Sequence, residues 1–160
     1  MLNNDLSQQI KRNFPYKPTE EQENAVKSFA EFLFSPSADS VFLMKGYAGT
    51  GKTTLTSALV RTLDSLQRKV ILLAPTGRAA KVFSGYAEHP AYTIHKKIYR
   101  QKVFSNETDN FVANQNLHRN TLFIVDEASM IANEGLSGGH FGSGRLLDDL
   151  VQYVYNGLGC

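Results

Sequence analysis

The segment that most constrains the fold of this chain is GYAGTGKT at residues 46–53. It follows the P-loop pattern of a glycine, four further residues, Gly-Lys and then Ser or Thr. Glycines let backbone amides turn inward toward phosphate oxygens, beside the positive end of the next helix. An apolar run, VFLMK at 41–45, precedes the motif, and leucines at helical spacing follow it. We therefore expect a buried strand, a phosphate-binding turn and an amphipathic helix, in that order.

The side chains of this motif suit a phosphate ligand with a metal ion. Lys52 can reach the β- and γ-phosphates of a nucleotide, and the Thr53 hydroxyl can bind Mg²⁺. The alternative is a glycine-rich turn with an incidental lysine, which the flanking strand and helix patterns disfavour. The predicted ligand-binding residues are Gly46, Gly49, Thr50, Gly51, Lys52, Thr53 and Thr54.

A second candidate site is the acidic pair Asp126 and Glu127, which follows the apolar run TLFIV at 121–125. Ligands of open parallel sheets bind at the carboxyl ends of the strands, the edge where a P-loop lies. There Asp126 can hold Mg²⁺ through water, and Glu127 can orient and deprotonate the water that attacks in hydrolysis. The alternative is a pair of acids that caps the start of a helix.

The pattern of apolar residues predicts an α/β domain. The run VILLA at 70–74 is typical of a further buried strand, beside those at 41–45 and 121–125. Three buried strands separated by helical segments indicate a parallel sheet with helices on both faces, and therefore three layers. The other expected elements are helices at 19–33, 78–83, 94–101 and 147–154, a small hairpin insert at 102–120 and a flexible Gly/Ser loop at 135–144.

Basic residues concentrate between Arg61 and Lys102, where nine bases accompany two acids. Such an excess marks either a phosphate-binding face or a solvated helix surface. Within it, APTGRAAK at 74–81 and YTIHKKIYR at 92–100 combine hydroxyls, bases and aromatic rings, which suit single-stranded nucleic acid. The alternatives are helix caps at the threonines and an ordinary basic helix face. The candidate contacts are Thr76, Gly77, Arg78, Thr93, His95 and Lys96.

Composition excludes several classes of protein. The single cysteine, Cys160, rules out an internal disulfide and a zinc site built on cysteines. No apolar run approaches the roughly 20 residues that a membrane-spanning helix needs. The N-terminus also lacks the pattern of a secretory signal. We therefore expect a cytoplasmic protein with no membrane contacts.

Gln22 has two interpretations. Its amide could bind the edge of an adenine base, or it could complete a capping box with Thr19, three residues earlier. The residues alone favour the capping box.

Five segments, taken in order, resemble the N-terminal part of superfamily 1 DNA helicases of the RecD-like branch. That branch moves 5′ to 3′ and includes the α chain of bacterial exodeoxyribonuclease V. The segments are TEEQ at 19–22, GYAGTGKTT at 46–54, LLAPTGRAAK at 72–81, YTIHKKIY at 92–99 and IVDEASMI at 124–131.

The resemblance implies an ATP site with Mg²⁺ in a RecA-like domain. It implies that Gln22 contacts adenine, which reverses the preference for capping. It also makes Asp126 the magnesium carboxylate and Glu127 the catalytic base, beside Lys52 and Thr53 at the phosphates.

The resemblance further implies contact with DNA. Thr76, Thr93 and His95 fall in segments that line the channel for single-stranded DNA in this family. The insert at 102–120 corresponds to a hairpin subdomain that helps to part the duplex, although it is short here. The implied function is ATP-dependent unwinding of DNA in repair or recombination, with exonuclease V subunits as candidate partners.

The family continues past the segment at 124–131 with a Gly-Asp…Gln strand and a second RecA-like domain that carries an arginine finger. We therefore expect residues 1–160 to be a C-terminally truncated first RecA-like ATPase domain, inactive by itself. Its exposed sheet edge predicts a homodimer.

Two other functions stay open. A small nucleotide or metabolite kinase shares the P-loop, but Glu127 suits water activation and no arginine-rich lid segment is present. A non-catalytic nucleic-acid-binding module would use only the basic range from Arg61 to Lys102.

Overall fold

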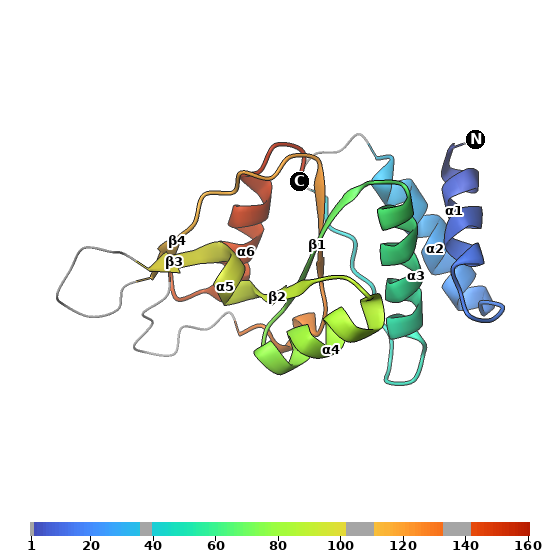
Figure 1. Cartoon of the computed structure of the whole chain (residues 1–160), viewed down its shortest axis with the longest axis horizontal. Coiled ribbons are helices and arrows are strands. Elements are labelled where there is room, and N and C mark those ends of the chain that lie inside the picture. The colour runs from blue at the N-terminus through green and yellow to red at the C-terminus, as the bar shows by residue number, and fades with distance from the viewer. Residues whose placement is uncertain (1, 36–39, 102–110, 133–141) are drawn as a thin grey trace. The chain divides into compact units, whose positions relative to one another are not determined.

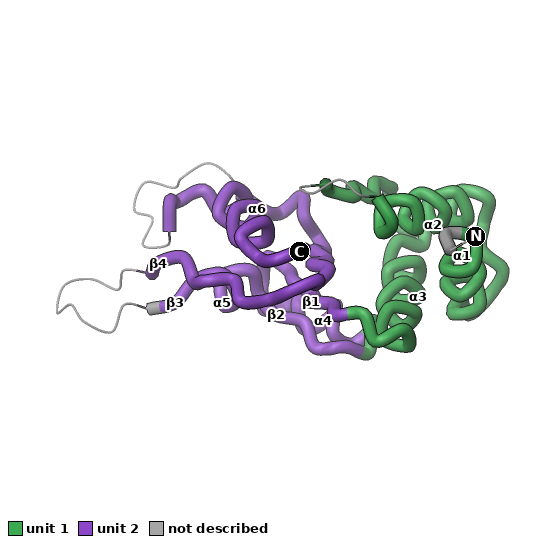
Figure 2. The backbone as a smooth tube through the Cα atoms, turned by 90° about the horizontal axis from the view of Figure 1, so that it is seen from above, with its two compact units in different colours: residues 1–68, 86–88 green, residues 69–85, 89–160 purple. Residues whose placement is uncertain are grey.

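The computed structural model describes residues 2–35, 40–101, 111–132 and 142–160 (Figure 1). The chain divides into two compact units (Figure 2). The first holds residues 1–68 and 86–88, and the second holds residues 69–85 and 89–160. None of the helices within the described ranges is both long enough and apolar enough to cross a bilayer.

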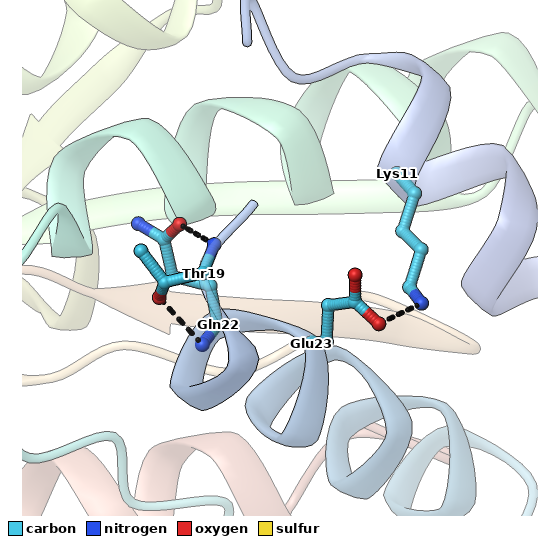
Figure 3. Close-up of polar contacts among 4 residues, drawn as sticks. All are labelled: Lys11, Thr19, Gln22 and Glu23. Atoms are coloured by element: carbon cyan, nitrogen blue, oxygen red, sulfur yellow. Dashed lines mark hydrogen bonds and ion pairs between the residues drawn. The ribbon is translucent and has the colours of Figure 1, made fainter. Parts of the chain in front are cut away.

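The first unit is built on three helices, α1 (Leu2–Arg12), α2 (Glu20–Leu33) and α3 (Lys52–Ser65). α1 packs against both α2 and α3, and it buries Leu6 and Ile10, which lie one turn apart. The Lys11 ammonium lies 2.6 Å from a carboxylate oxygen of Glu23 on α2 (Figure 3). α1 is not among the elements predicted from the sequence, although Leu2, Leu6 and Ile10 recur four residues apart, which is a helical spacing.

The two helices predicted around the P-loop are confirmed. α2 buries Val26 and Phe29, and α3 buries Leu55, Leu59 and Leu63 along one face. This spacing of three or four residues is what an amphipathic helix requires.

The apolar run at 41–45 departs from the prediction. It forms no strand, and Val41 and Leu43 are 71% and 65% exposed. The Phe42 ring instead lies 5.6 Å from the ring of Phe29 and 5.7 Å from that of Phe32. The prediction of a buried strand is wrong because an apolar run specifies no hydrogen-bonding partner. Here aromatic packing on α2 holds the segment.

The second unit contains a parallel sheet in the order β2-β1-β5. β1 (Lys69–Ala74) is central, and β2 (Ala91–Thr93) and β5 (Thr121–Val125) pair with it on either side. Every residue of β1 after Lys69 is buried, so both of its faces are covered. The parallel sheet and the predicted strands at 70–74 and 121–125 are confirmed. β2 escapes prediction because a strand of three residues is too short to show a periodic pattern.

Three helices accompany this sheet: α4 (Gly77–Ala87), α5 (Ile94–Ile98) and α6 (Leu146–Tyr155). Strand residues Ile71 and Leu73 share a core cluster with Ile94, Ile98, Tyr99, Leu150 and Tyr153. The predicted C-terminal helix is therefore confirmed. It places Leu150 and Tyr153 on the core, whereas Leu147 and Val151 are each 40% exposed.

A second, antiparallel sheet pairs β3 (Tyr99–Gln101) with β4 (Phe111–Ala113). The helix predicted over 94–101 is wrong in its second half, since α5 ends at Ile98 and Tyr99 is extended, with φ −115° and ψ 153°. Pairing with β4 supplies backbone partners that a longer helix would otherwise provide. The first part of the predicted hairpin insert at 102–120, residues 102–110, lies outside the described residues.

Tyr99 also connects this strand pair to α6. Its hydroxyl donates to Asp149 Oδ2 at 2.6 Å, and the backbone amide of Ser143 donates to the same oxygen at 2.9 Å. Burial, together with the Asp149 carboxylate, raises the pKa of Tyr99, so the phenol keeps the proton that it donates. A Cβ on Gly142 would overlap both side chains. Residues 142–144 at the end of the predicted flexible loop thus lie beside Tyr99 and Asp149, and the rest of the loop lies outside the described residues.

Candidate functional site

The P-loop turn leads directly into α3. Gly49 and Gly51 have φ values of 82° and 80°, in the left-handed region that favours glycine. Between them, the Thr50 hydroxyl donates to the carbonyl oxygen of Tyr47 at 2.8 Å. Gly51 is the N-cap of α3, where no side chain makes a capping hydrogen bond. Amides at such a helix start bind anions, and the helix dipole adds to the attraction.

Lys52 folds back over this turn. Its ammonium donates to the carbonyl oxygens of Gly46 at 2.6 Å and Tyr47 at 2.7 Å. These neutral acceptors hold the charge at the loop, but a phosphate oxygen makes a stronger, charge-assisted partner. The ammonium can therefore exchange two carbonyls for a phosphate without leaving the turn.

The groups present fit a phosphate ligand with Mg²⁺. Left-handed glycines, helix-start amides and one ammonium supply donors for phosphate oxygens, and the exposed Thr53 supplies a hydroxyl oxygen that a hard cation accepts. Bound Mg²⁺ would offset the charge of the phosphates.

Gln22 completes the capping box at the start of α2. Its backbone amide donates to Thr19 Oγ1 at 3.3 Å, and its Oε1 accepts from the Thr19 amide at 3.0 Å (Figure 3). The interpretation that the residues alone favour is thus confirmed. Gln22 also lies against the P-loop, because a Cβ on Gly51 would overlap its Nε2 atom. The adenine contact implied by the resemblance stays a prediction.

In the second unit, the parallel sheet brings three predicted segments to one edge. The register pairs Ala74 with Thr93 and Leu73 with Val125, so the three strands end at the same level. The Asp126 amide continues the pairing by donating to the Leu73 carbonyl at 3.0 Å. The segments that follow these strand ends are 76–78, 93–96 and 126–127. The predicted DNA contacts and the acidic pair therefore share one edge.

Both threonines at this edge cap helices. Thr76 Oγ1 accepts from the Ala79 amide at 3.1 Å, and Thr93 Oγ1 accepts from the Lys96 amide at 3.2 Å. These two capping alternatives are confirmed. Because each oxygen acts as an acceptor, the hydroxyl hydrogen is the part that suits a phosphate oxygen.

Glu127 has a backbone conformation that is rare for a residue with a side chain. Its φ is 52° and its ψ is 38°, and its amide donates to Asp126 Oδ1 at 2.9 Å. Although Glu127 is the N-cap of the short helix η1 (Ala128–Met130), its carboxylate makes no capping bond. The capping alternative therefore does not account for Glu127. Strained backbone of this kind concentrates at functional sites.

The segment after β2 combines aromatic rings with bases. The Lys97 ammonium lies 5.4 Å from the centroid of the Tyr92 ring, which is a cation–π distance. Burial lowers the pKa of His95 below its ordinary value of 6.5, so this imidazole is neutral at pH 7. Its ring lies 5.7 Å from that of Tyr99. Lys96 is exposed, so it offers a charge to a ligand where His95 does not.

The predicted site residues thus fall into two groups. The P-loop residues and Gln22 belong to the first unit, whereas the acidic pair and the predicted DNA contacts belong to the second. Sequence reasoning missed Tyr16, whose hydroxyl lies 3.1 Å from Thr54 Oγ1 in the first unit. No motif includes this tyrosine, and its only signal is the proline on each side, at positions 15 and 18.

The left-handed backbone of Glu127 predicts that glycine stabilises this position relative to alanine, the opposite of its usual effect. The left-handed region costs a residue with a Cβ about 1–2 kcal/mol, so Glu127→Gly should be more stable than Glu127→Ala by about 1 kcal/mol in urea unfolding. Ala128→Gly, at a neighbouring position with an ordinary φ, should instead reduce stability. If Glu127→Ala proved the more stable of the pair, the left-handed conformation would be refuted.

Comparison with known proteins identifies relatives of this chain. Residues 17–138 match the family described as the AAA domain. The chain is 28% identical over 154 residues to the uncharacterized protein MJ1519 of Methanocaldococcus jannaschii. It is 32% identical over 107 residues to the multifunctional conjugation protein TraI of Escherichia coli. It is 37% identical over 90 residues to the ATP-dependent DNA helicase dda of enterobacteria phage T4.

These alignments cover 86%, 62% and 54% of this chain, but only 12%, 6% and 20% of the three relatives. The chain thus corresponds to a small part of each. The family match covers most of the chain, and the observed parallel sheet agrees with a RecA-like P-loop fold. The chain therefore belongs to the AAA domain family.

Proposed function

We propose that this chain is the ATP-binding domain of a superfamily 1 DNA helicase. The observation that carries the proposal is the turn at 46–53, where left-handed glycines and Lys52 lie at the start of α3. The similarity of the chain to a relative named as an ATP-dependent DNA helicase supports the assignment to a helicase.

Within this function, Lys52 and the P-loop amides bind the phosphates of ATP, and Thr53 and Asp126 hold Mg²⁺. Glu127 is the general base that takes a proton from the attacking water. Two features support this role: the backbone of Glu127 is left-handed, and its carboxylate makes no capping hydrogen bond although the residue is an N-cap. A carboxylate held in this way can aim at a water molecule without first breaking a helix cap.

Single-stranded DNA is the proposed polymer ligand. Exposed Arg78 and Lys96 follow two neighbouring strand ends, and Thr76 and Thr93 offer hydroxyls at the same edge. Phosphate contacts of this kind position a strand without reading its sequence. The Tyr92 ring adds a stacking surface.

More specific assignments rest on the resemblance of the ordered motifs. We assign the chain to the RecD-like branch, as a first RecA-like ATPase domain acting in repair or recombination, with exonuclease V subunits as candidate partners. The hairpin insert, the adenine contact of Gln22 and a homodimer are further predictions.

The nucleotide site can be tested by calorimetric titration of the chain with Mg-ADP. Lys52→Ala removes a charge-assisted bond, which contributes about 1.5–3 kcal/mol, so affinity should fall about tenfold to a hundredfold. Lys45→Ala is the matched control, since it removes an exposed lysine just before the motif. Equal binding by the wild type and Lys52→Ala would reject the P-loop assignment.

DNA binding should depend strongly on salt. Each lost phosphate contact reduces the slope of log affinity against log salt by about 0.7 for a single strand, so Lys96→Ala should show this reduction in fluorescence anisotropy. Lys27→Ala, which removes an exposed lysine from α2, should leave the slope unchanged. If both variants kept the wild-type slope, Lys96 would be a solvated surface residue.

A further inference from the structure

The segment before α2 approaches the P-loop at two separate points. The Tyr16 hydroxyl lies 3.1 Å from Thr54 Oγ1, in the first turn of α3. A few residues later, Gln22 Nε2 lies so close to Gly51 that no side chain fits there. Tyr16 and Gln22 therefore both lie beside the start of α3, where Lys52 stands.

Tyr16 is held by its surroundings although its ring is exposed. Phe14 is buried, prolines occupy positions 15 and 18, and Thr19 is fixed as the N-cap of α2. Because a proline restricts its own backbone and that of the preceding residue, these two prolines restrict residues 14, 15, 17 and 18, on both sides of Tyr16. The hydroxyl bond to Thr54 restrains the other end of the side chain. The ring nevertheless remains 55% exposed.

A restrained, exposed aromatic ring beside a phosphate site matches the needs of a nucleotide base. A base is flat and apolar on its faces, and stacking on an aromatic side chain contributes about 1–3 kcal/mol. The ring loses less conformational entropy on binding than a free side chain, because the hydroxyl contact with Thr54 already restrains it. An isolated exposed tyrosine needs no explanation, but this tyrosine is bonded to a residue of the predicted ligand-binding set.

We propose that Tyr16 forms one wall of the base-binding part of this site, with its ring stacked on the base of a nucleotide. The inference rests on the proposed nucleotide-binding function. Stacking is insensitive to the exocyclic groups of the base, so Tyr16 supplies affinity for a base and Gln22 is the group available for recognising its edge. Tyr16 is in this view a specificity-determining residue for nucleosides over bare phosphates.

The test compares a ligand that has a base with one that lacks it. The full chain is titrated calorimetrically with Mg-ADP and with Mg-pyrophosphate, which shares two phosphates with ADP. Tyr16→Ala should weaken ADP binding about 5- to 100-fold and leave pyrophosphate binding unchanged. Tyr16→Phe, which keeps the ring, should remain closer to the wild type than Tyr16→Ala. Phe34→Ala is the matched control, because it removes another exposed ring, 45% accessible, from the same unit.

Two outcomes would overturn the inference. Unchanged ADP binding by Tyr16→Ala would show that the ring is outside the site, and an equal loss for both ligands would show that Tyr16 only supports the loop. If Tyr16→Ala does not fold, Tyr16→Leu keeps the apolar bulk without the aromatic ring and provides the same comparison. The failure of the proposed function has a different signature, since the wild type would then bind neither ligand or would match Lys52→Ala.

Discussion

Parallel pairing around β1 is the constraint on which the second unit depends. Because β2 and β5 both run parallel to β1, the three strands end at one edge, and the polar segments that follow them lie together there. Burial of both faces of β1 fixes this strand at the centre. Residues far apart in the sequence, such as Thr76, Thr93 and Asp126, are thereby brought to a common edge.

In the first unit, the loop at 46–53 is held in place together with the positive charge of Lys52. Left-handed glycines turn the backbone into α3, and two carbonyls hold the Lys52 ammonium. The ammonium of Lys52 thus donates to neutral backbone carbonyls, which a phosphate can replace as acceptors. The Thr19–Gln22 capping box sets the start of α2 beside this loop, and the left-handed, side-chain-free Gly51 permits the close approach.

Local patterns predicted much of this structure. The capping box, the helix after the P-loop, and the strands at 70–74 and 121–125 follow from spacing and residue type, which act over a few residues. The prediction of a strand at 41–45 is wrong because strand formation also needs a hydrogen-bonding partner, which no local pattern specifies. α5 ended early for the same reason, since Tyr99 pairs with Ala113 through contacts that are distant in sequence. The left-handed backbone of Glu127 and the contact of Tyr16 with Thr54 depend on the three-dimensional structure, so no sequence motif predicts them.

The central claim is that the turn at 46–53 and the start of α3 bind the phosphates of a nucleotide. Hydrogen–deuterium exchange with and without Mg-ADP tests this directly, because bound phosphate oxygens protect the amides that they contact. We expect slower exchange at residues 49–54, with α6 (Leu146–Tyr155) unaffected. Unchanged exchange at 49–54 under saturating Mg-ADP, or protection confined to other segments, would contradict the claim.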